Sequence, residues 1–434
     1  MVIPRPTVRE HLGLLPRTRD IAGLLNHLYE RWGPIVDVGY RYPLDMVYLF
    51  GPEANQLILH DRPENFLWGD ALSTLIPVNG PTALVVTDGD EHARRRRLVQ
   101  PAFAKRRVDA HLELIVEEAD RMLESWIPGR SVDAWAEGRT AIRRIVVRAL
   151  FGHRLGRQAD QIGELLEPAL KYVNSNPATR VDVDLRFNGY GKAARARRAV
   201  DGFVQQEIDR RRSAIGDDGD ADILSALLAA SDDGDSLSDA EIRDQVRSLI
   251  AAGYDTTTSA LSWLIYGLGA NPSKMTSMAE QVRDLLGDRP PTIGDLRTLS
   301  AVDGVVRETL RLWPPGTVSL RTAIEPFECY GHEIDAGRLV VYSPYITHRM
   351  ETIWDDPSSF RPERWLEGEP APYSYVPFGG GGRNCIGFAL ATLELQVFAV
   401  RLVQHCRWTV DRDEPRSKAV ASFAPTGGLP ITIE

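Results

Sequence analysis

Apolar residues recur at helical spacing along most of the chain. This spacing predicts helices over 20–32, 91–100, 108–127, 139–152, 159–172 and 192–212. A longer helix begins after Ser238, which forms a capping-box pattern with Glu241, and meets no proline before Asn271-Pro272. A helix over 301–313 ends at Pro314-Pro315, because proline cannot continue it. The last predicted helix begins at 388 and ends near 403.

Short alternating segments replace the helical pattern in two places, around 33–60 and 317–345. The strands are therefore segregated from a helical core over 90–315 and 385–404, which predicts a mainly α protein with a small β region. We expect residues 1–434 to form one domain. Residues 66–88 are apolar but broken by Gly and Pro, so they form either a buried connector or a binding surface.

Composition and charge narrow the class of protein. The chain has 434 residues, of which 43 % are hydrophobic and 26 % charged, as in a globular protein with a sizeable core. The net charge of −9 argues against general nucleic-acid binding. Charges run through the first 30 residues, and no apolar run is long enough to span a bilayer. We therefore expect a cytoplasmic, monomeric protein without a transmembrane anchor.

A glycine-rich stretch near the C-terminal end carries the first candidate chemistry. It reads Phe378-Gly-Gly-Gly-Gly-Arg-Asn-Cys-Ile-Gly387 and leads directly into the last predicted helix. A cysteine at a helix N-terminus faces the positive end of the helix dipole, which favours thiolate, a soft metal ligand. The three cysteines are far apart, which argues against a disulfide framework. Cys329 and Cys406 lack glycine neighbours and are interpreted as small buried hydrophobes.

The middle of the long helix contains poor helix formers, in the sequence Ala251-Ala-Gly-Tyr-Asp-Thr-Thr-Thr258. Threonine hydroxyls bond back to the carbonyl four residues earlier and can bend a helix. One interpretation is a tolerated kink. The other is a groove that holds a small ligand beside Thr256, with Asp255 supplying protons.

Four motifs, which follow one another along the chain in the family's order, resemble the cytochrome P450 family of haem-thiolate monooxygenases. The glycine stretch matches the family signature at Phe378, Gly381, Arg383, Cys385 and Gly387, and the long helix matches at Ala252, Gly253, Asp255 and Thr256. A Glu-x-x-Arg motif lies at Glu308 and Arg311, and a Pro-Glu-Arg-aromatic motif at Pro362 to Trp365. The resemblance implies the P450 fold, a triangular helical prism around a buried haem.

The resemblance also implies a cofactor site for haem b. Cys385 would be the axial thiolate and the metal ligand, with Ala252, Phe378, Gly379 and Gly387 beside the cofactor. The propionates would meet cations, and the candidates are His92, Arg96, Arg321 and Arg383, with His348 weaker. Glu308, Arg311 and Arg364 would form a buried ionic network behind the haem.

The implied activity inserts one atom of O2 into a mainly hydrophobic organic molecule, with two electrons from NAD(P)H through a separate donor. Asp255 and Thr256 would be the catalytic residues that deliver protons. The alternatives are a haem-thiolate peroxygenase or isomerase, and a non-catalytic haem or apolar-ligand binding protein. A phosphate-binding glycine loop is excluded, because no Lys-Ser/Thr follows the glycines.

Substrate and donor sites follow from the same resemblance. The irregular segment 173–190 is expected near the substrate, and the individual pocket candidates are Leu72, Leu75, Ile76, Val78, Ala251, Val318, Ser319 and Phe423. Arg94, Arg95 and Arg97 form either a solvated face or the docking face of an acidic ferredoxin or flavin-type reductase.

Overall fold

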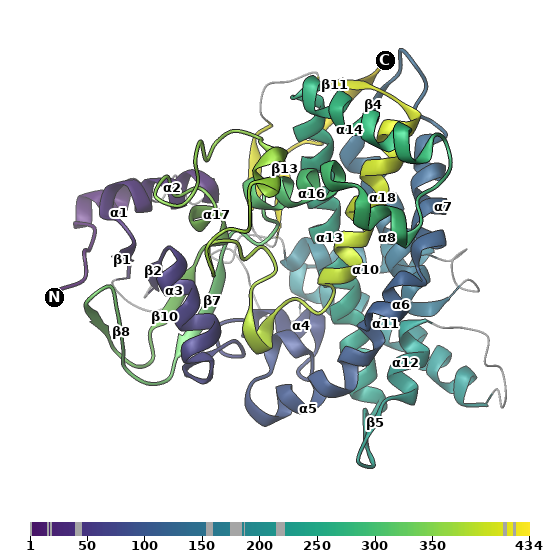
Figure 1. Cartoon of the computed structure of the whole chain (residues 1–434). Coiled ribbons are helices and arrows are strands. Elements are labelled where there is room, and N and C mark those ends of the chain that lie inside the picture. Colours follow the sequence, from purple (N-terminus) through teal and green to yellow (C-terminus); the bar gives the residue numbers. More distant parts are fainter. Residues whose placement is uncertain are drawn as a thin grey trace.

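The computed structural model describes residues 2–14, 17, 20–39, 46–152, 159–173, 185, 187–213, 222–410, 415–419 and 422–434. Helices make up the larger part of the molecule, and a smaller β-rich part lies beside them, with the N-terminus (Figure 1). The α-helices are α1 Val8–Leu14, α2 Ile21–Trp32, α3 Pro52–Gln56, α4 Ile76–Asn79, α5 Gly89–Val99, α6 Lys105–Asp109, α7 Leu112–Leu123, α8 Ala134–Phe151, α10 Ala159–Val173, α11 Gly189–Ser213, α12 Ile223–Ala229, α13 Asp239–Gly269, α14 Pro272–Leu286, α15 Ile293–Thr298, α16 Ser300–Leu312, α17 Pro344–Thr347 and α18 Phe388–His405.

The strands are short and fall into several small sheets. They are β1 Ile35–Asp37, β2 Met46–Leu49, β3 Phe66–Leu67, β4 Ser131–Asp133, β5 Ser231–Asp232, β6 Asp235–Ser236, β7 Ser319–Ala323, β8 Phe327–Cys329, β9 His332–Ile334, β10 Leu339–Tyr342, β11 Trp408–Val410, β12 Ser417–Ala419, β13 Phe423–Pro425 and β14 Pro430–Ile433. The largest sheet has five strands in the order β1-β2-β10-β7-β3. Only the β2–β10 pair in it is parallel.

The long helix α13 is the central element of the helical part. It contacts α8, α16 and α18, and its second half is buried on all sides (Figure 1). The predicted capping box is present, since the Ser238 hydroxyl accepts from the Glu241 amide and the Glu241 carboxylate accepts from the Ser238 amide. The helix is continuous through Gly253 and Thr256, so the poor helix formers do not break it. Packing on several sides outweighs their weak intrinsic preference.

The expectation of a β-rich segment over 33–60 was wrong at its end. Strands occupy 35–37 and 46–49, but α3 and a single wide helical turn, η2 Leu57–Asp61, follow. Gly51 has a φ of 109° and Pro52 stands at the first helical position, where proline is favoured. Gly-Pro was therefore a helix start signal that the alternation of apolar residues concealed.

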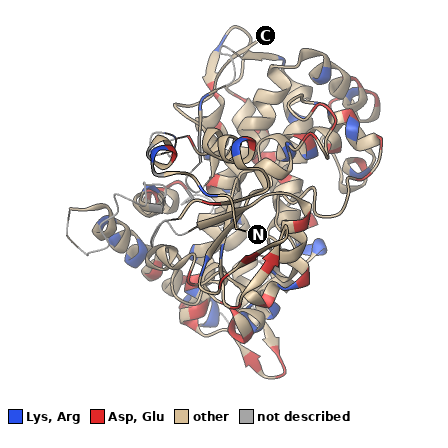
Figure 2. Cartoon of the chain, turned by 90° about the vertical axis from the view of Figure 1, so that its left-hand side faces the viewer, with Lys and Arg blue, Asp and Glu red and all other residues tan. Residues whose placement is uncertain are grey.

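Charged residues of both signs are interspersed over the molecule, and the β5–β6 hairpin projects as an acidic finger at the lower edge of Figure 2. Within the described ranges, no helix is both long and apolar enough to cross a bilayer.

Candidate active site

A cavity of about 440 Å³ lies between α13 and the glycine-rich loop that precedes α18. The two motifs that the sequence analysis singled out therefore meet across one space. Most of its walls are apolar. The lining residues include Trp68, Leu84, Val85, His92, Arg96, Gln245, Leu249, Ala252, Thr256, Ala260, Val318, Ser319, Phe378, Gly379, Arg383 and Cys385.

The glycine-rich loop folds back on itself so that Cys385 stands at the cavity wall. The Cys385 amide donates to the Phe378 carbonyl at 2.9 Å, which closes the loop. Gly379 and Gly381 have φ values of 70° and 60°, a region that other residues rarely adopt. A Cβ on Gly381 would lie 2.0 Å from the Leu59 carbonyl oxygen. These glycines are required by backbone conformation and by the close approach of η2.

The Cys385 thiol is accessible from the cavity yet enclosed by protein. Burial raises the pKa of the thiol, while a hydrogen bond from the Gly387 amide and the charge of Arg96 act in the opposite direction. Burial therefore acts against the preference for thiolate that is expected at a helix N-terminus. A bound metal cation would favour the deprotonated sulfur.

One stripe of α13 forms the opposite wall. Ala252 is exposed although it lies in the middle of a long packed helix, because the cavity lies over it. The Thr256 hydroxyl donates to the Ala252 carbonyl one turn earlier. Sequence reasoning missed further residues of the stripe, although most of them lie at helical spacings of three, four, seven or eight from Ala252: Gln245, Ser248, Leu249, Thr257 and Ala260.

Asp255 is adjacent to Thr256 but is not among the residues that line the cavity. It is buried beside Arg139, whose guanidinium lies 3.4 Å from the Asp255 carboxylate. Arg139 also pairs with Glu167 of α10 at 2.9 Å. A chain of charged groups thus leads from Asp255 toward the half-buried surface of α10.

Four predicted cations gather at one end of the cavity. His92, Arg96 and Arg383 line it, and Arg321 is buried directly behind Ser319, whose hydroxyl it contacts at 2.7 Å. Arg383 pairs with Asp88, and Arg96 donates to the backbone and side-chain oxygens of Asn384, at 2.8 and 2.6 Å.

Burial lowers the pKa of each of these four side chains, which disfavours its positively charged form. Burial lowers the pKa of Arg96 and of Arg321. Burial also lowers the pKa of Arg383 to about 10, against the attraction of Asp88. For His92, burial and the neighbouring Arg383 and Arg96 lower the pKa to about 4, so the imidazole is neutral at pH 7. This end of the cavity therefore carries more positive charge than Asp88 neutralises.

Glu308, Arg311 and Arg364 form a buried network, as their motifs suggested. Glu308 and Arg311 are fully buried and make two parallel hydrogen bonds of 2.8 and 2.9 Å, and Arg364 donates to Glu308 at 3.0 Å. The Trp365 indole also donates to Glu308, at 3.1 Å.

His348 was a weak propionate candidate, and the structure corrects this. It is completely buried behind the glycine loop, where Nδ1 meets the Arg311 carbonyl at 3.2 Å and Nε2 accepts from the Val376 amide at 2.9 Å. Its pKa is lowered to about 3, by burial and by Arg311. The neutral ring therefore links the ionic network to the start of the loop that carries Cys385.

Of the predicted substrate residues, Val318 and Ser319 line the cavity and the others do not. Phe423 is a correction: it stacks on Trp263 at 5.4 Å within the core. Val78 is another, since it packs with α10 and α11 residues such as Ala169 and Tyr172. The remaining candidates are half-buried outside the lining: Leu72, Leu75, Ile76 and Ala251. Residues 174–184 and 186 of the predicted segment 173–190 lie outside the described residues.

The predicted docking arginines divide between two roles. Arg94 pairs with Asp235 at 2.7 Å and Glu241 at 2.6 Å, and Arg95 is buried against Glu241 at 2.8 Å. Arg97 is exposed and meets Asp232 at 3.1 Å. Arg94 and Arg95 thus fasten α5 to the acidic β5–β6 hairpin and to the start of α13, so they do not form a free basic face.

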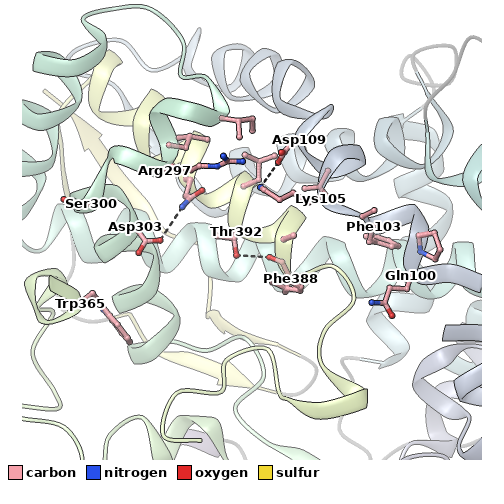
Figure 3. A pocket seen from close by; sticks show the side chains of 18 of the residues that line it. Gln100, Phe103, Lys105, Asp109, Arg297, Ser300, Asp303, Trp365, Phe388 and Thr392 are labelled. Carbon is pink, nitrogen blue, oxygen red and sulfur yellow. Dashed lines mark hydrogen bonds and ion pairs between the residues drawn. The ribbon is translucent and has the colours of Figure 1, made fainter. Parts of the chain in front are cut away.

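A broad groove of about 1170 Å³ lies on the outer side of α18 (Figure 3). Phe388 and Thr392 of α18 line this groove, whereas Ala391 and Leu395 of the same helix face the cavity. Phe388 is 47 % exposed and Leu366 is 66 % exposed. Lys105, Arg97 and Arg297 are exposed basic residues among the lining. The groove is therefore open to the surface, and one of its lining residues, Phe388, is only three positions after Cys385 in the sequence.

The comparisons with known proteins agree with this geometry. The family model described as Cytochrome P450 matches residues 4–426. The chain belongs to the cytochrome P450 family. "Putative cytochrome P450 139" of Mycobacterium tuberculosis is 37 % identical over 418 residues, which cover 94 % of this chain and 96 % of the relative. "Cyclooctat-9-en-7-ol 5-monooxygenase" of Streptomyces melanosporofaciens is 32 % identical and covers 75 % of this chain and 72 % of its own length.

A solved P450 structure, "Retinoic acid bound cyanobacterial CYP120A1", superposes with a TM-score of 0.88 and 27 % identity, covering 100 % of this chain and 99 % of that one. The predicted P450 fold is thereby confirmed, and the chain is a cytochrome P450 monooxygenase. This family holds haem through a cysteine thiolate.

The residues present suit a haem group on two independent grounds. An accessible thiol stands at an apolar cavity, and thiolate sulfur is a ligand that haem iron accepts. Arg96, Arg321 and Arg383 gather at the end of the cavity, and among the described residues Asp88 is the carboxylate that pairs with one of them, Arg383. Two positive charges are left over, which two propionates would balance.

Proposed function

We propose that this P450 binds haem b through Cys385 and inserts one oxygen atom of O2 into a mainly hydrophobic organic molecule. The second oxygen atom leaves as water, and NAD(P)H supplies the two electrons through a separate donor. The observation that carries the proposal is the single cavity that Cys385, Thr256 and the cation cluster share.

The roles of the chain's own residues follow from their placement. Cys385 would provide the thiolate that holds the haem iron, and Arg96, Arg321 and Arg383 would hold the propionates. When bound, haem iron with a thiolate ligand supplies the chemistry that splits dioxygen rather than storing it. Phe378 and Gly379 lie along the same wall and shield the sulfur side from water.

Thr256 and Asp255 supply protons in this proposal. The Thr256 hydroxyl faces the cavity, where it can hold a water molecule over the reacting centre. Asp255, Arg139 and Glu167 form a charged path that leads away from the cavity. A carboxylate that alternates between Arg139 and the Thr256 side would carry protons inward from that path. A peroxygenase or an isomerase needs no such path, which favours the monooxygenase.

The substrate class is inferred from the cavity walls. Leu84, Val85, Leu249, Ala260 and Val318 are apolar. One relative is named for its action on cyclooctat-9-en-7-ol, and the structural neighbour contains retinoic acid. We infer a substrate of the same kind, a largely hydrocarbon molecule with few polar groups.

The groove beside α18 is the proposed docking site of the electron donor. It combines exposed apolar side chains with Arg97, Lys105 and Arg297, so a small acidic protein such as a ferredoxin fits its charge. Residues 385–388 join the groove to the sulfur, which gives a short route for electrons. Arg97 is retained from the predicted docking face, while Arg94 and Arg95 are assigned to the internal ion pairs.

The proposal is tested by reconstituting the purified chain with haem and recording the reduced carbon monoxide complex. A thiolate ligand shifts the Soret band to the red, and we expect that shift in the native chain and its loss in Cys385→Ser. Cys406→Ser is the control, because that thiol lies at the far end of α18. A shifted band that survives in Cys385→Ser would refute the assignment.

A second test addresses the proton path. In Thr256→Ala we expect NAD(P)H consumption to continue, product to fall about tenfold or more, and hydrogen peroxide to rise, since general acid–base groups contribute about 10²–10⁴-fold. Thr258→Ala is the matched control, because Thr258 bonds to Tyr254 and faces the core. Unchanged coupling of product to NAD(P)H in Thr256→Ala would show that this hydroxyl does not deliver protons.

A further inference from the structure

Trp68 is a lining residue of the cavity that no motif identified. It follows the short strand β3 and enters the cavity wall beside the cation cluster. Its indole Nε1 is buried and has no hydrogen-bond partner in the described structure. Buried donors in native proteins almost always have a partner, because leaving one without a partner is destabilising. An unpaired donor at a cofactor cavity indicates a ligand acceptor.

The surroundings of Trp68 specify the charge of that acceptor. The Arg321 guanidinium lies 4.3 Å from the centre of the indole ring and that of Arg383 lies 5.4 Å away. Asp88 fixes this arrangement, since it accepts hydrogen bonds from the Trp68 and Gly69 amides, at 2.9 and 2.6 Å, and also pairs with Arg383. Two cations thus lie beside the indole, and Asp88 is already committed to Arg383 and to the backbone of Trp68 and Gly69. The missing partner of this group is an anion.

We propose that the indole N–H of Trp68 binds one propionate carboxylate of the haem, together with Arg321 and Arg383. This inference rests on the proposed haem cofactor and adds a neutral donor to the cationic ones. A neutral donor gives direction to the contact, because a single N–H has one preferred line of approach. The charged groups supply attraction, and Trp68 supplies orientation.

The test compares haem with its dimethyl ester, which lacks both carboxylate charges. The loaded protein is mixed with excess apomyoglobin, and the rate of cofactor transfer is measured for the native chain, for Trp68→Phe and for Trp126→Phe. Phenylalanine keeps an aromatic ring beside the arginines but removes the N–H and part of the ring, and the dimethyl ester separates the loss of the hydrogen bond from the loss of packing. Trp126 is the matched control, since its Nε1 is also buried without a partner in the described structure, but it lies in the core and not at the cavity.

We expect Trp68→Phe to lose haem about tenfold faster than the native chain, or more, which is the change for one hydrogen bond to a charged acceptor. With the dimethyl ester, the two proteins should lose cofactor at the same rate, and Trp126→Phe should match the native chain with both cofactors. Equal acceleration with haem and with the ester would assign Trp68 to packing alone and overturn the inference. An unchanged rate with haem would also overturn it. A native chain that takes up no haem would instead refute the proposed function.

Discussion

The arginines of α5 fall into two groups that differ in what neutralises them. Arg94 and Arg95 face the β5–β6 hairpin and the start of α13, where Glu241 and Asp235 pair with them. Arg96, on the other side of the same helix, faces the cavity and donates to neutral oxygens of Asn384, and no carboxylate among the described residues pairs with it. One helix therefore carries both a completed ion-pair network and an incomplete one.

The pKa of Arg94 and the pKa of Arg96 move in opposite directions. Hydrogen bonds that Arg94 donates to Asp235 and Glu241 raise the pKa of Arg94, and burial lowers the pKa of Arg96. Burial alone would raise the pKa of Glu241, yet its bonds to Arg94, Ser238 and Arg95 lower it to about 2. Completed pairs hold the fold together, whereas uncompensated cations favour the binding of an anion. The difference tells structural charges from functional ones.

The largest expected effect is the removal of a carboxylate from a completed network. Glu308→Ala would leave Arg311 and Arg364 buried without their anion, and breaking such a network costs about 3–5 kcal/mol of unfolding free energy. We expect little haem-bound protein from this variant, measured by the haem content of the purified chain.

Glu369→Ala is the control for Glu308→Ala. Glu369 pairs with Arg307 of the same helix, α16, but its side chain is 74 % exposed, and surface pairs contribute about 0–1 kcal/mol. Normal haem loading in Glu308→Ala would contradict the structural role of the network.

The next prediction compares substitutions at two neighbouring residues of α5. Arg96→Met should raise the rate of haem loss about tenfold or more, because a charge-assisted bond contributes about 1.5–3 kcal/mol, with a small effect on the stability of the apoprotein. Arg95→Met should do the reverse, lowering apoprotein stability while haem loss stays near the native rate. The measurements are urea unfolding of the apoprotein and transfer of haem to apomyoglobin. Equal behaviour of the two variants would remove the distinction between the groups.

A smaller effect is expected from pH, through His92. Its pKa is lowered to about 4 in the fold, by burial and by Arg383 and Arg96, from an ordinary 6.5. The unfolded chain therefore binds a proton at this position between pH 6.5 and 4 that the folded apoprotein does not, so the His92 contribution to stability is lost as pH falls through that window. Urea unfolding of the apoprotein should depend on pH less steeply in His92→Gln than in the native chain. Bound haem should reduce this difference, because propionates favour the protonated imidazole. An identical pH dependence in the two apoproteins would contradict the assignment.

The structural features that depend on neighbouring residues were predictable from the sequence, whereas contacts between distant segments were not. The capping box at Ser238, the proline stop after α16 and the glycine loop around Cys385 depend on neighbours along the chain, and their positions agree with the structure. Family resemblance placed Thr256 and Cys385 in one site. Pairing partners were not predictable in this way, since Glu241 lies about 146 residues from Arg95. His348 and Phe423 were misjudged for the same reason, because their surroundings come from distant segments.

The smallest expected effect concerns the docking groove. Its lining includes two exposed basic residues, Arg97 and Lys105. Lys105→Glu should raise the KM for an acidic ferredoxin a few-fold at low salt, and the effect should shrink as ionic strength rises, because exposed charges are screened within about 10 Å at 0.1 M. Arg97→Gln should act in the same direction but less, because it removes one positive charge whereas Lys105→Glu also adds a negative one, and both side chains already pair with an aspartate. Lys192→Glu on α11 is the control, an equally exposed lysine that does not line the groove. A donor KM that changes as much in Lys192→Glu as in Lys105→Glu would mean that the donor responds to net charge alone. A change confined to Lys105 and Arg97 would place the donor over α18, on the other side of the helix from the substrate.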